Sequence, residues 1–283
     1  MILVLGSSGQ VASELKRLPG VVALGRPDID FCDLASISDA IERARPSVVI
    51  NAAAYTVVDT AEDEADVAHL INALAPGEVA RVCRDLDIPI VHISTDYVFD
   101  GIKTHPYLPH DDCNPQGVYG ASKRAGEEAI MASGCQHVIL RTSWVFSRHG
   151  SNFVKTMLRI GQERGQLSVV SDQMGGPTSA NAIAQCCFEI AQHMVADKSI
   201  GGIFHFSGVP QVSWFEFANE IFRISGLEVD LAPIATDAYP TRARRPQYSV
   251  LDCQSTRDAF GVVQPDWRVD LLRVMKELGK ANV

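Results

Sequence analysis

The chain has 283 residues, of which 46% are hydrophobic and 21% charged, a balance typical of a globular protein. Its formal net charge of −9 argues against nucleic acid or an anionic membrane as the main partner, because both attract proteins through a basic field. No apolar run approaches the roughly 20 residues of a membrane span, and the first residues lack the features of a signal peptide. Seven cysteines without metal-ligand spacing indicate reduced thiols, so we expect a cytoplasmic protein.

The first half of the chain alternates short apolar runs with longer amphipathic segments. Five runs are typical of buried strands: residues 2–6, 21–25, 47–53, 88–95 and 137–144. Strands alternating with helices predict right-handed βαβ units, and hence an α/β fold with a Rossmann-like, doubly wound parallel sheet. Ligands of such sheets bind beyond the carboxyl ends of the strands, so polar residues at those ends are the first candidates for a site.

A glycine motif follows the first predicted strand. Gly6 permits a tight turn, Gly9 lets a pyrophosphate approach the backbone, and Ala12 lets the next helix pack closely on the strand. The spacing GxxGxxA differs from GxGxxG, and a glycine pattern alone also fits an ordinary βα turn. The position of the motif between a strand and a helix nevertheless predicts a dinucleotide site.

The end of the second predicted strand bears on the choice of cofactor. An acidic residue there binds the ribose 2′-hydroxyl of NAD, whereas a nearby arginine suits the 2′-phosphate of NADP. This chain has Gly25 at the expected position of the acid, and Arg26 follows it. We therefore expect NADPH, with NADH as a possible substitute; an exposed loop arginine is the other explanation of Arg26.

Small residues and hydroxyl groups end the next two predicted strands. Residues 52–54 are alanines that leave space for the ribose and nicotinamide of a cofactor, although a closely packed helix would need the same small residues. Thr95 and Asp96 stand at the end of the run over residues 88–95, at the carboxyl edge of the sheet. A hydroxyl there can share a substrate carbonyl with a second proton donor.

Tyr119 and Lys123 lie four residues apart at the start of a predicted helix, and therefore on one face of it. A cation beside a phenol lowers the phenol pKa from about 10, which makes Tyr119 a candidate general acid. With the Thr95 hydroxyl nearby and Lys123 on the cofactor ribose, the three residues form a proton-transfer set. Tyrosine and lysine at this spacing also occur on solvated faces, and we expect residues 126–128, Gly-Glu-Glu, to be such a face.

The second half of the chain is less regular. Its predicted helices, over residues 152–165, 179–195, 214–226 and 269–279, are separated by short strands and Pro-rich connections. We expect residues 1–147 to form an NAD(P)-binding domain. Residues 148–283 should form mainly a smaller, mixed α/β substrate-binding domain, with some later elements returning to the first sheet. Gly175 to Pro177 would suit a hinge.

Together these motifs resemble one family, and the resemblance covers nearly the whole chain. The glycine motif and the Tyr-x-x-x-Lys pair specify only the extended short-chain dehydrogenases. The segments NAAAYTVVDTAE, STDYVFDG, RTSWVF, NFVKTMLRIGQERGQLSVVSDQMGGPT and YPTRARRPQYSVLD are similar to those of dTDP-4-dehydrorhamnose reductases. The resemblance implies reduction by NAD(P)H of the C4 ketone of dTDP-4-dehydro-L-rhamnose to dTDP-L-rhamnose, with the sugar nucleotide bound mainly by residues 148–283.

The resemblance also implies roles for individual residues. Tyr119 would be the proton donor, Lys123 its partner and ribose contact, and Thr95 the hydroxyl that polarises the ketone. The cofactor contacts carried over, beside Gly6 and Arg26, are Gly9, Gln10, Val11, Asp33, Leu34, Ala54, Tyr55 and Thr56. The sugar contacts carried over are Thr95, Asp96 and Trp144. The arginines of a Pro-bounded loop would either meet the diphosphate or stay solvated; they are Arg242, Arg244 and Arg245.

Some members of the family bind magnesium at a dimer interface through three glutamates. Glu14 and Glu277 match two of these positions, and Asn181 stands at the third. Because loss of one carboxylate weakens a site for a hard cation, we expect no structural magnesium, and a monomer or weak homodimer.

Three other functions stay open on the sequence alone. A sugar-nucleotide dehydratase needs a glutamate after the Thr-Asp pair, where this chain has Tyr97. A 4-ketoreductase for another dTDP-deoxysugar differs in C4 stereochemistry, which residue spacing does not reveal. A non-catalytic NADP-binding regulatory subunit need not keep its sugar contacts, so the full set present here favours an enzyme.

Overall fold

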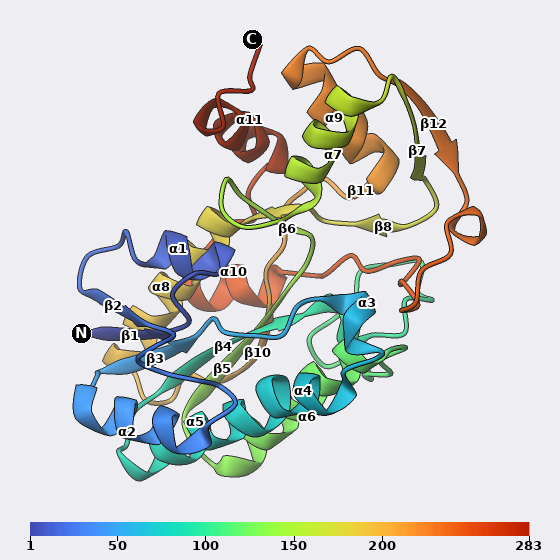
Figure 1. Cartoon of the computed structure of the whole chain (residues 1–283). Coiled ribbons are helices and arrows are strands. Elements are labelled where there is room, and N and C mark those ends of the chain that lie inside the picture. The colour runs from blue at the N-terminus through green and yellow to red at the C-terminus, as the bar shows by residue number, and fades with distance from the viewer. Residues whose placement is uncertain (283) are drawn as a thin grey trace.

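The computed structural model describes residues 1–282 and is built around a sheet of six parallel strands (Figure 1). In spatial order the strands are β10 (Gly202–His205), β5 (His137–Thr142), β4 (Ile90–Thr95), β3 (Val48–Asn51), β1 (Ile2–Leu5) and β2 (Val21–Leu24). Every neighbouring pair is parallel. The predicted α/β fold with a doubly wound parallel sheet is thus confirmed. The order reverses between β1 and β3, so a crevice opens beyond their carboxyl ends.

Helices cover both faces of the sheet, because successive strand residues point to opposite sides. Val4 belongs to one apolar core, whereas Leu3 and Leu5 belong to the other. The first core is shared with α1 (Gln10–Leu15), α8 (Ala180–Ala196) and α10 (Gln254–Phe260). The second is shared with α2 (Leu34–Ala44), α5 (Ala75–Asp85) and α6 (Val118–Ser133), and Figure 1 shows these three helices on the same side of the sheet.

Local sequence signals explain where the longer helices begin and end. The Ser179 hydroxyl caps α8 by accepting from the Ala182 backbone N–H at 3.1 Å. α9 (Trp214–Ser225) begins with a capping box formed by Ser213 and Glu216. Helix α6 ends where Gly134 adopts a left-handed φ of 75°, which glycine tolerates without a Cβ clash.

A C-terminal lobe lies beyond the sheet and encloses its own apolar core (Figure 1). Its helices are α7 (Phe153–Glu163), α9 and α11 (Trp267–Glu277). Its strands form three pairs: β7 (Gln166–Val170) with β12 (Asp230–Ile234), β8 (Met174–Gly175) with β11 (Val212–Ser213), and β6 (Val145–Phe146) with β9 (Thr178–Ser179).

The chain passes between the sheet and this lobe more than once. Helix α8, strand β10 and helix α10 all follow residue 148, yet they pack on the large sheet. Short helices α3 (Val58–Ala61) and α4 (Ala65–His69) lead into a π-helical turn, η1 (Leu70–Leu74), which continues as α5. None of the described helices has the length and apolar composition needed to cross a membrane.

Candidate active site

The carboxyl end of β4 and the first turn of α6 bring a threonine, an aspartate and a tyrosine together. Thr95 Oγ1 donates to Asp96 Oδ1 at 3.1 Å and accepts from the Tyr97 backbone N–H at 3.2 Å. Tyr119 is the second residue of α6, and its phenol lies close enough to the Thr95 hydroxyl for that group to affect its pKa. Its ring also meets the Tyr97 ring edge-on, with the centroids 5.5 Å apart. The hydroxyl and the phenol singled out in the sequence therefore lie at one edge of the sheet.

The pKa of Tyr119 differs from the expectation. Burial raises this pKa above its usual value near 10, the neighbouring Thr95 hydroxyl lowers it, and the charge of Asp96 raises it again. The expectation that Lys123 lowers this pKa is wrong for the described structure, because the Lys123 amine contacts β4 instead of the phenol. A phenol that is protonated at neutral pH is nevertheless the state that a proton donor needs.

Lys123 is buried against β4, with only 2% of its surface exposed. Its Nζ donates to the Ile93 carbonyl at 2.7 Å and lies 3.1 Å from His92 Nε2. His92 Nδ1 in turn lies 3.1 Å from Asn51 Nδ2 on the adjacent strand β3. Burial lowers the pKa of Lys123 to about 8, partly offset by the charge of Glu127, and burial also holds the pKa of His92 well below its usual range. Sequence reasoning missed His92 and Asn51, although a polar residue inside an apolar strand run is a detectable signal.

Asp96 carries a buried carboxylate oxygen that the protein leaves unpaired. The residue is 2% exposed, and its Oδ2 has no hydrogen-bond partner among residues 1–282. Burial raises the pKa of Asp96 to about 6, against hydrogen bonds from Ser249 and Thr95 that lower it. Because buried polar atoms are nearly always hydrogen-bonded, this oxygen beside Thr95 and Tyr119 indicates a place for a polar ligand.

The Gly-Glu-Glu segment after Lys123 is not the solvated face expected from the sequence. Gly126 and Glu127 are buried, and only Glu128 is exposed. Glu127 accepts from Arg141 Nε at 2.9 Å and from Arg141 Nη2 at 2.7 Å. Although burial raises the pKa of Glu127, the hydrogen bonds and charge of Arg141 hold it below its usual value. The signal lay in the spacing: Glu127 stands four residues after Lys123 and shares its buried face.

The glycine loop between β1 and α1 has the space that a pyrophosphate needs. Gly6 has a left-handed φ of 106° and packs on the backbone just after β3, since a Cβ there would lie 3.2 Å from Ala53 N. A Cβ at Gly9 would meet nothing within 4 Å, and no side chain caps α1 there. Val11 is buried in the core, so only its backbone can face a ligand, while the side chain of Gln10 turns toward the C-terminal lobe.

The end of β2 has the two features expected of an NADP site, a position without an acidic side chain and a neighbouring arginine without a polar partner among the described residues. A Cβ at Gly25 would overlap Ser7 in the glycine loop, which explains why no acidic side chain stands there. Arg26 is exposed and has no hydrogen bond or ion pair with any described residue. Asp33 caps α2 through Oδ1, which accepts from the Ala35 N–H at 3.1 Å, and the half-buried Leu34 begins that helix.

Residues 54–56 are held in place by an asparagine that sequence reasoning missed. Asn72 Oδ1 accepts from the Tyr55 backbone N–H at 2.8 Å, and Asn72 Nδ2 donates to the Tyr55 carbonyl at 3.0 Å. The same amide donates to Ser122 Oγ on α6 at 3.0 Å. Asn72 lies in the π-helical turn, whose extra residue no periodic pattern in the sequence reveals. It joins the predicted cofactor loop to the helix of Tyr119.

Trp144 stands where β5 enters the C-terminal lobe, with a left-handed φ of 47°. Its ring stacks on that of Trp214 at a centroid distance of 3.4 Å and an angle of 5°. A Cβ at Gly175 would overlap the Trp144 indole, and one at Gly176 would press on the Gly208 carbonyl. The Gly175 to Pro177 segment is therefore buried and closely packed, unlike the hinge expected from the sequence.

The arginine loop lines a pocket of about 450 Å³ with Arg242, Arg244 and Arg245. Arg245 Nη2 pairs with Asp59 Oδ2 at 2.6 Å, and Arg245 Nη1 donates to the Tyr97 hydroxyl at 3.0 Å. The other two arginines contact Asp63 and Gln116. Arg245 is half-buried in these contacts, whereas Arg242 and Arg244 stay exposed to solvent, and a diphosphate bound by Arg245 would have to replace some of its partners.

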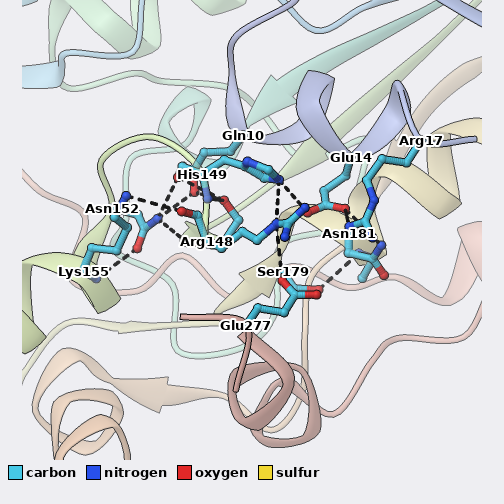
Figure 2. A network of polar contacts seen from close by, with 12 residues as sticks. Gln10, Glu14, Arg17, Arg148, His149, Asn152, Lys155, Ser179, Asn181 and Glu277 are labelled. Carbon is cyan, nitrogen blue, oxygen red and sulfur yellow. Dashed lines mark hydrogen bonds and ion pairs between the residues drawn. The ribbon is translucent and has the colours of Figure 1, made fainter. Parts of the chain in front are cut away.

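The carboxylates considered for a metal have partners within the chain (Figure 2). Glu14 Oε1 lies 3.1 Å from His149 Nε2, and Asn181 Nδ2 lies 3.5 Å from Glu14 Oε2. Glu277 Oε2 pairs with Arg148 Nε at 3.6 Å. Within residues 1–282, no three His, Cys, Asp or Glu side chains gather closely enough to hold a metal ion.

The chain matches the family model of the RmlD substrate binding domain over residues 1–280. A dTDP-4-dehydrorhamnose reductase of Sinorhizobium fredii is 40% identical over 97% of this chain and 96% of its own length. The solved structure of a dTDP-4-dehydrorhamnose reductase from Clostridium acetobutylicum is similar with a TM-score of 0.91 and 36% identity, covering 98% of this chain and 99% of that one. A dTDP-4-dehydrorhamnose reductase of Bacillus anthracis, solved in complex with NADP, has a TM-score of 0.90 and 34% identity over 98% of both chains. The chain belongs to the RmlD substrate binding domain family.

Proposed function

We propose that the protein is an NADPH-dependent dTDP-4-dehydrorhamnose reductase, which reduces the C4 ketone of dTDP-4-dehydro-L-rhamnose to give dTDP-L-rhamnose. The observation that carries the proposal is the cluster of Thr95, Asp96 and Tyr119, with its unpaired buried oxygen, at the carboxyl edge of the sheet. The full-length relatives with this name support it. The dehydratase alternative lacks its glutamate, because Tyr97 occupies that position and is hydrogen-bonded to Arg245.

The proton in this reaction comes from Tyr119. Its raised pKa keeps the phenol protonated until negative charge develops on the C4 oxygen, and the phenol then donates its proton to that oxygen. Thr95 would place a second hydroxyl beside the same oxygen and stabilise the developing charge by turning its proton from Asp96 toward that oxygen. NADPH supplies the hydride to C4. To reach the cofactor ribose, Lys123 would exchange its present contacts with His92 and Ile93.

The proposed cofactor site runs from the glycine loop to residues 54–56. Gly6 lets the loop pack on residues 52–53, and Gly9 leaves the backbone space for the pyrophosphate. Arg26 stands at the end of β2 without a polar contact to any residue that the structure describes, and it favours the 2′-phosphate of NADPH over NADH. The NADP in the Bacillus anthracis relative supports this preference.

The proposed sugar site lies between the sheet edge and the C-terminal lobe. Asp96 Oδ2 would accept from a sugar hydroxyl, and Trp144 would contact the deoxysugar ring. Arg244 and Arg245 would bind the diphosphate, the charged part of a ligand that an overall acidic protein otherwise repels. We further propose a cytoplasmic monomer or weak homodimer, in keeping with the cysteine pattern and with the intrachain partners of Glu14.

Oxidation of NADPH tests the proposal, with dTDP-4-dehydro-L-rhamnose made in situ from its precursor. Tyr119→Phe should lower kcat by about 10²- to 10⁴-fold, because only the general acid is removed. The Kd for NADPH should stay within about threefold of the wild type. The matched control is Tyr248→Phe, which removes only a hydroxyl bonded to Gln211. Absence of turnover by the wild type would contradict the function, and an active Tyr119→Phe would contradict the mechanism.

A further inference from the structure

The side chain of Gln10 bridges the glycine loop and the C-terminal lobe. Gln10 is the first residue of α1, directly after Gly9. Its Oε1 accepts a hydrogen bond from Asn152 Nδ2 at 2.9 Å (Figure 2). It accepts a second one from Ser147 Oγ at 2.8 Å. These partners lie 137 and 142 residues further along the chain. A residue predicted to touch the cofactor phosphates thus uses its side chain to hold the segment over residues 147–152, here called the 147–152 loop.

Asn152 organises this loop and also starts the next helix. Its Nδ2 donates to the Ser147 carbonyl at 2.7 Å and to the His149 carbonyl at 3.3 Å, in addition to Gln10. Its Oδ1 accepts from the Lys155 backbone N–H at 3.2 Å and so caps α7. The loop, the helix start and the glycine loop therefore share one amide side chain.

An aromatic chain continues from this point to the proposed sugar site. Phe153 follows Asn152, and its ring lies 4.6 Å from that of Trp214. Trp214 stacks face to face on Trp144 at 3.4 Å. Gly175 also lies close to the Trp144 indole, because a Cβ there would overlap the ring, so Trp144 contacts both the stack and a buried backbone segment. From Gln10 to Trp144, every step is a hydrogen bond, a peptide bond or a ring contact.

We propose that Gln10 is a positioning residue that couples the two ligand sites: by fixing the 147–152 loop, it aligns the aromatic stack that presents Trp144 to the sugar. The inference rests on the proposed function, because it takes the cofactor to lie on the glycine loop and the sugar nucleotide beside Trp144. A ligand that orders α1 then orders the loop as well, and binding of the first ligand lowers the cost of binding the second. The coupling must be reciprocal, since it is a difference between binding free energies.

Two variants of Gln10 separate this role from a simple structural one. Gln10→Ala removes the acceptor oxygen, so it should weaken binding of the sugar nucleotide while the backbone phosphate site stays intact. Gln10→Glu keeps an acceptor for Ser147 and Asn152 but places a negative charge beside the phosphates. It should therefore weaken cofactor binding and leave the coupling in place. General destabilisation would not weaken mainly the sugar nucleotide in one variant and mainly the cofactor in the other.

Asn152→Asp tests the loop side of the contact. Aspartate keeps the Oδ1 that caps α7 but loses the donor to Gln10 and to the Ser147 and His149 carbonyls, so a carboxylate oxygen then faces these acceptors. Ser147→Ala removes the second donor to Gln10, together with the two contacts of Ser147 Oγ to the His149 backbone, and serves if Asn152→Asp does not fold, as judged by circular dichroism. Gln166→Ala is the matched control, because the amide of Gln166 contacts only the exposed Asp230.

The measurement is calorimetric binding of dTDP-L-rhamnose with and without saturating NADP⁺, and of NADP⁺ alone. The wild type and Gln166→Ala should bind the sugar nucleotide at least about fivefold tighter when NADP⁺ is present. The coupling ratio is the Kd for dTDP-L-rhamnose without NADP⁺ divided by the Kd with saturating NADP⁺. In Gln10→Ala and Asn152→Asp this ratio should fall to nearly one, with Kd for NADP⁺ changed less than about threefold. Gln10→Glu should keep the ratio and raise Kd for NADP⁺ about tenfold.

The outcomes distinguish this inference from the function on which it rests. A wild-type ratio of one, or an unchanged ratio in Gln10→Ala and Asn152→Asp, would overturn the coupling while leaving the reductase intact. Parallel weakening of both ligands in all variants would reduce Gln10 to a structural contact. Failure of the wild type to bind dTDP-L-rhamnose at all would overturn the proposed function, and the coupling with it.

Discussion

Burial disfavours the ionised form of Asp96. It is buried at the end of β4, one oxygen has no partner within the described chain, and burial raises its pKa to about 6. Below pH about 4 the carboxyl is protonated both folded and unfolded, and no cost arises. Between about pH 4 and 6 only the unfolded chain ionises, so folding stability falls as the pH rises through this window. Above pH 6 the folded protein bears the full free-energy cost of a buried, ionised carboxylate, as expected of a group that serves ligand binding rather than stability.

Asp96→Asn should therefore stabilise the ligand-free protein at pH 7. A pKa raised by about two units corresponds to about 3 kcal/mol, and an asparagine side chain accepts from Thr95 without carrying a charge. In urea unfolding, the free energy of unfolding of the Asp96→Asn variant should exceed that of the wild type by about 2 to 3 kcal/mol at pH 7, and should equal it below pH about 4. Turnover should fall because the sugar contact is altered. An Asp96→Asn protein that is less stable at pH 7 would refute this account of the buried carboxylate.

Helix α6 is joined to the sheet by a buried ion pair as well as by apolar packing. Glu127 and Arg141 are 0% and 1% exposed and make two hydrogen bonds to each other, one turn beyond Lys123. Breaking such a pair from one side leaves an uncompensated buried charge, which costs more than the pair contributes. The pair therefore fixes the position of α6, and with it the depth at which Tyr119 and Lys123 lie beside β4.

Glu127→Gln should destabilise the protein by about 3 kcal/mol or more, because Arg141 stays charged and buried. Glu128→Gln is a matched control one residue away: Glu128 is exposed and pairs only with Arg124, so its loss should cost less than about 1 kcal/mol. Urea titrations of the three proteins at pH 7 give the comparison. Equal costs for the two substitutions would show that the buried pair does not anchor the helix.

The sequence predicted elements better than it predicted contacts between them. The five apolar runs and the four-residue spacing of Tyr119 and Lys123 depend on local periodicity, which can be read directly from the sequence. The partner of Lys123 depends on the β3–β4 register that sets His92 beside Asn51, and periodicity does not encode register. The partners of Gln10 lie more than a hundred residues away, and Asn72 lies in a π-turn, so neither had a local signal.

The whole molecule has apolar cores on both faces of the sheet and another in the C-terminal lobe, but the chain does not divide cleanly between sheet and lobe. Helix α8 supplies a large share of the first core from residues that follow the first elements of the lobe. Strand β10 and helix α10 return to the same sheet later still. A division into domains at residue 147 would therefore leave one face of the sheet covered only by α1, and residues such as Val91 and Leu140 would lose the packing that α8 supplies.

The sheet and the lobe should consequently unfold together. Differential scanning calorimetry is expected to show a single transition with calorimetric and van't Hoff enthalpies in agreement, because unfolding of either part strips apolar contacts from elements that the chain shares. Residues 1–147 expressed alone should aggregate or lack near-ultraviolet circular dichroism, since α8 and β10 are missing. Two resolved transitions, or a folded and soluble fragment of residues 1–147, would show instead that the first half is an independent domain and that the later elements only cover a sheet already stable without them.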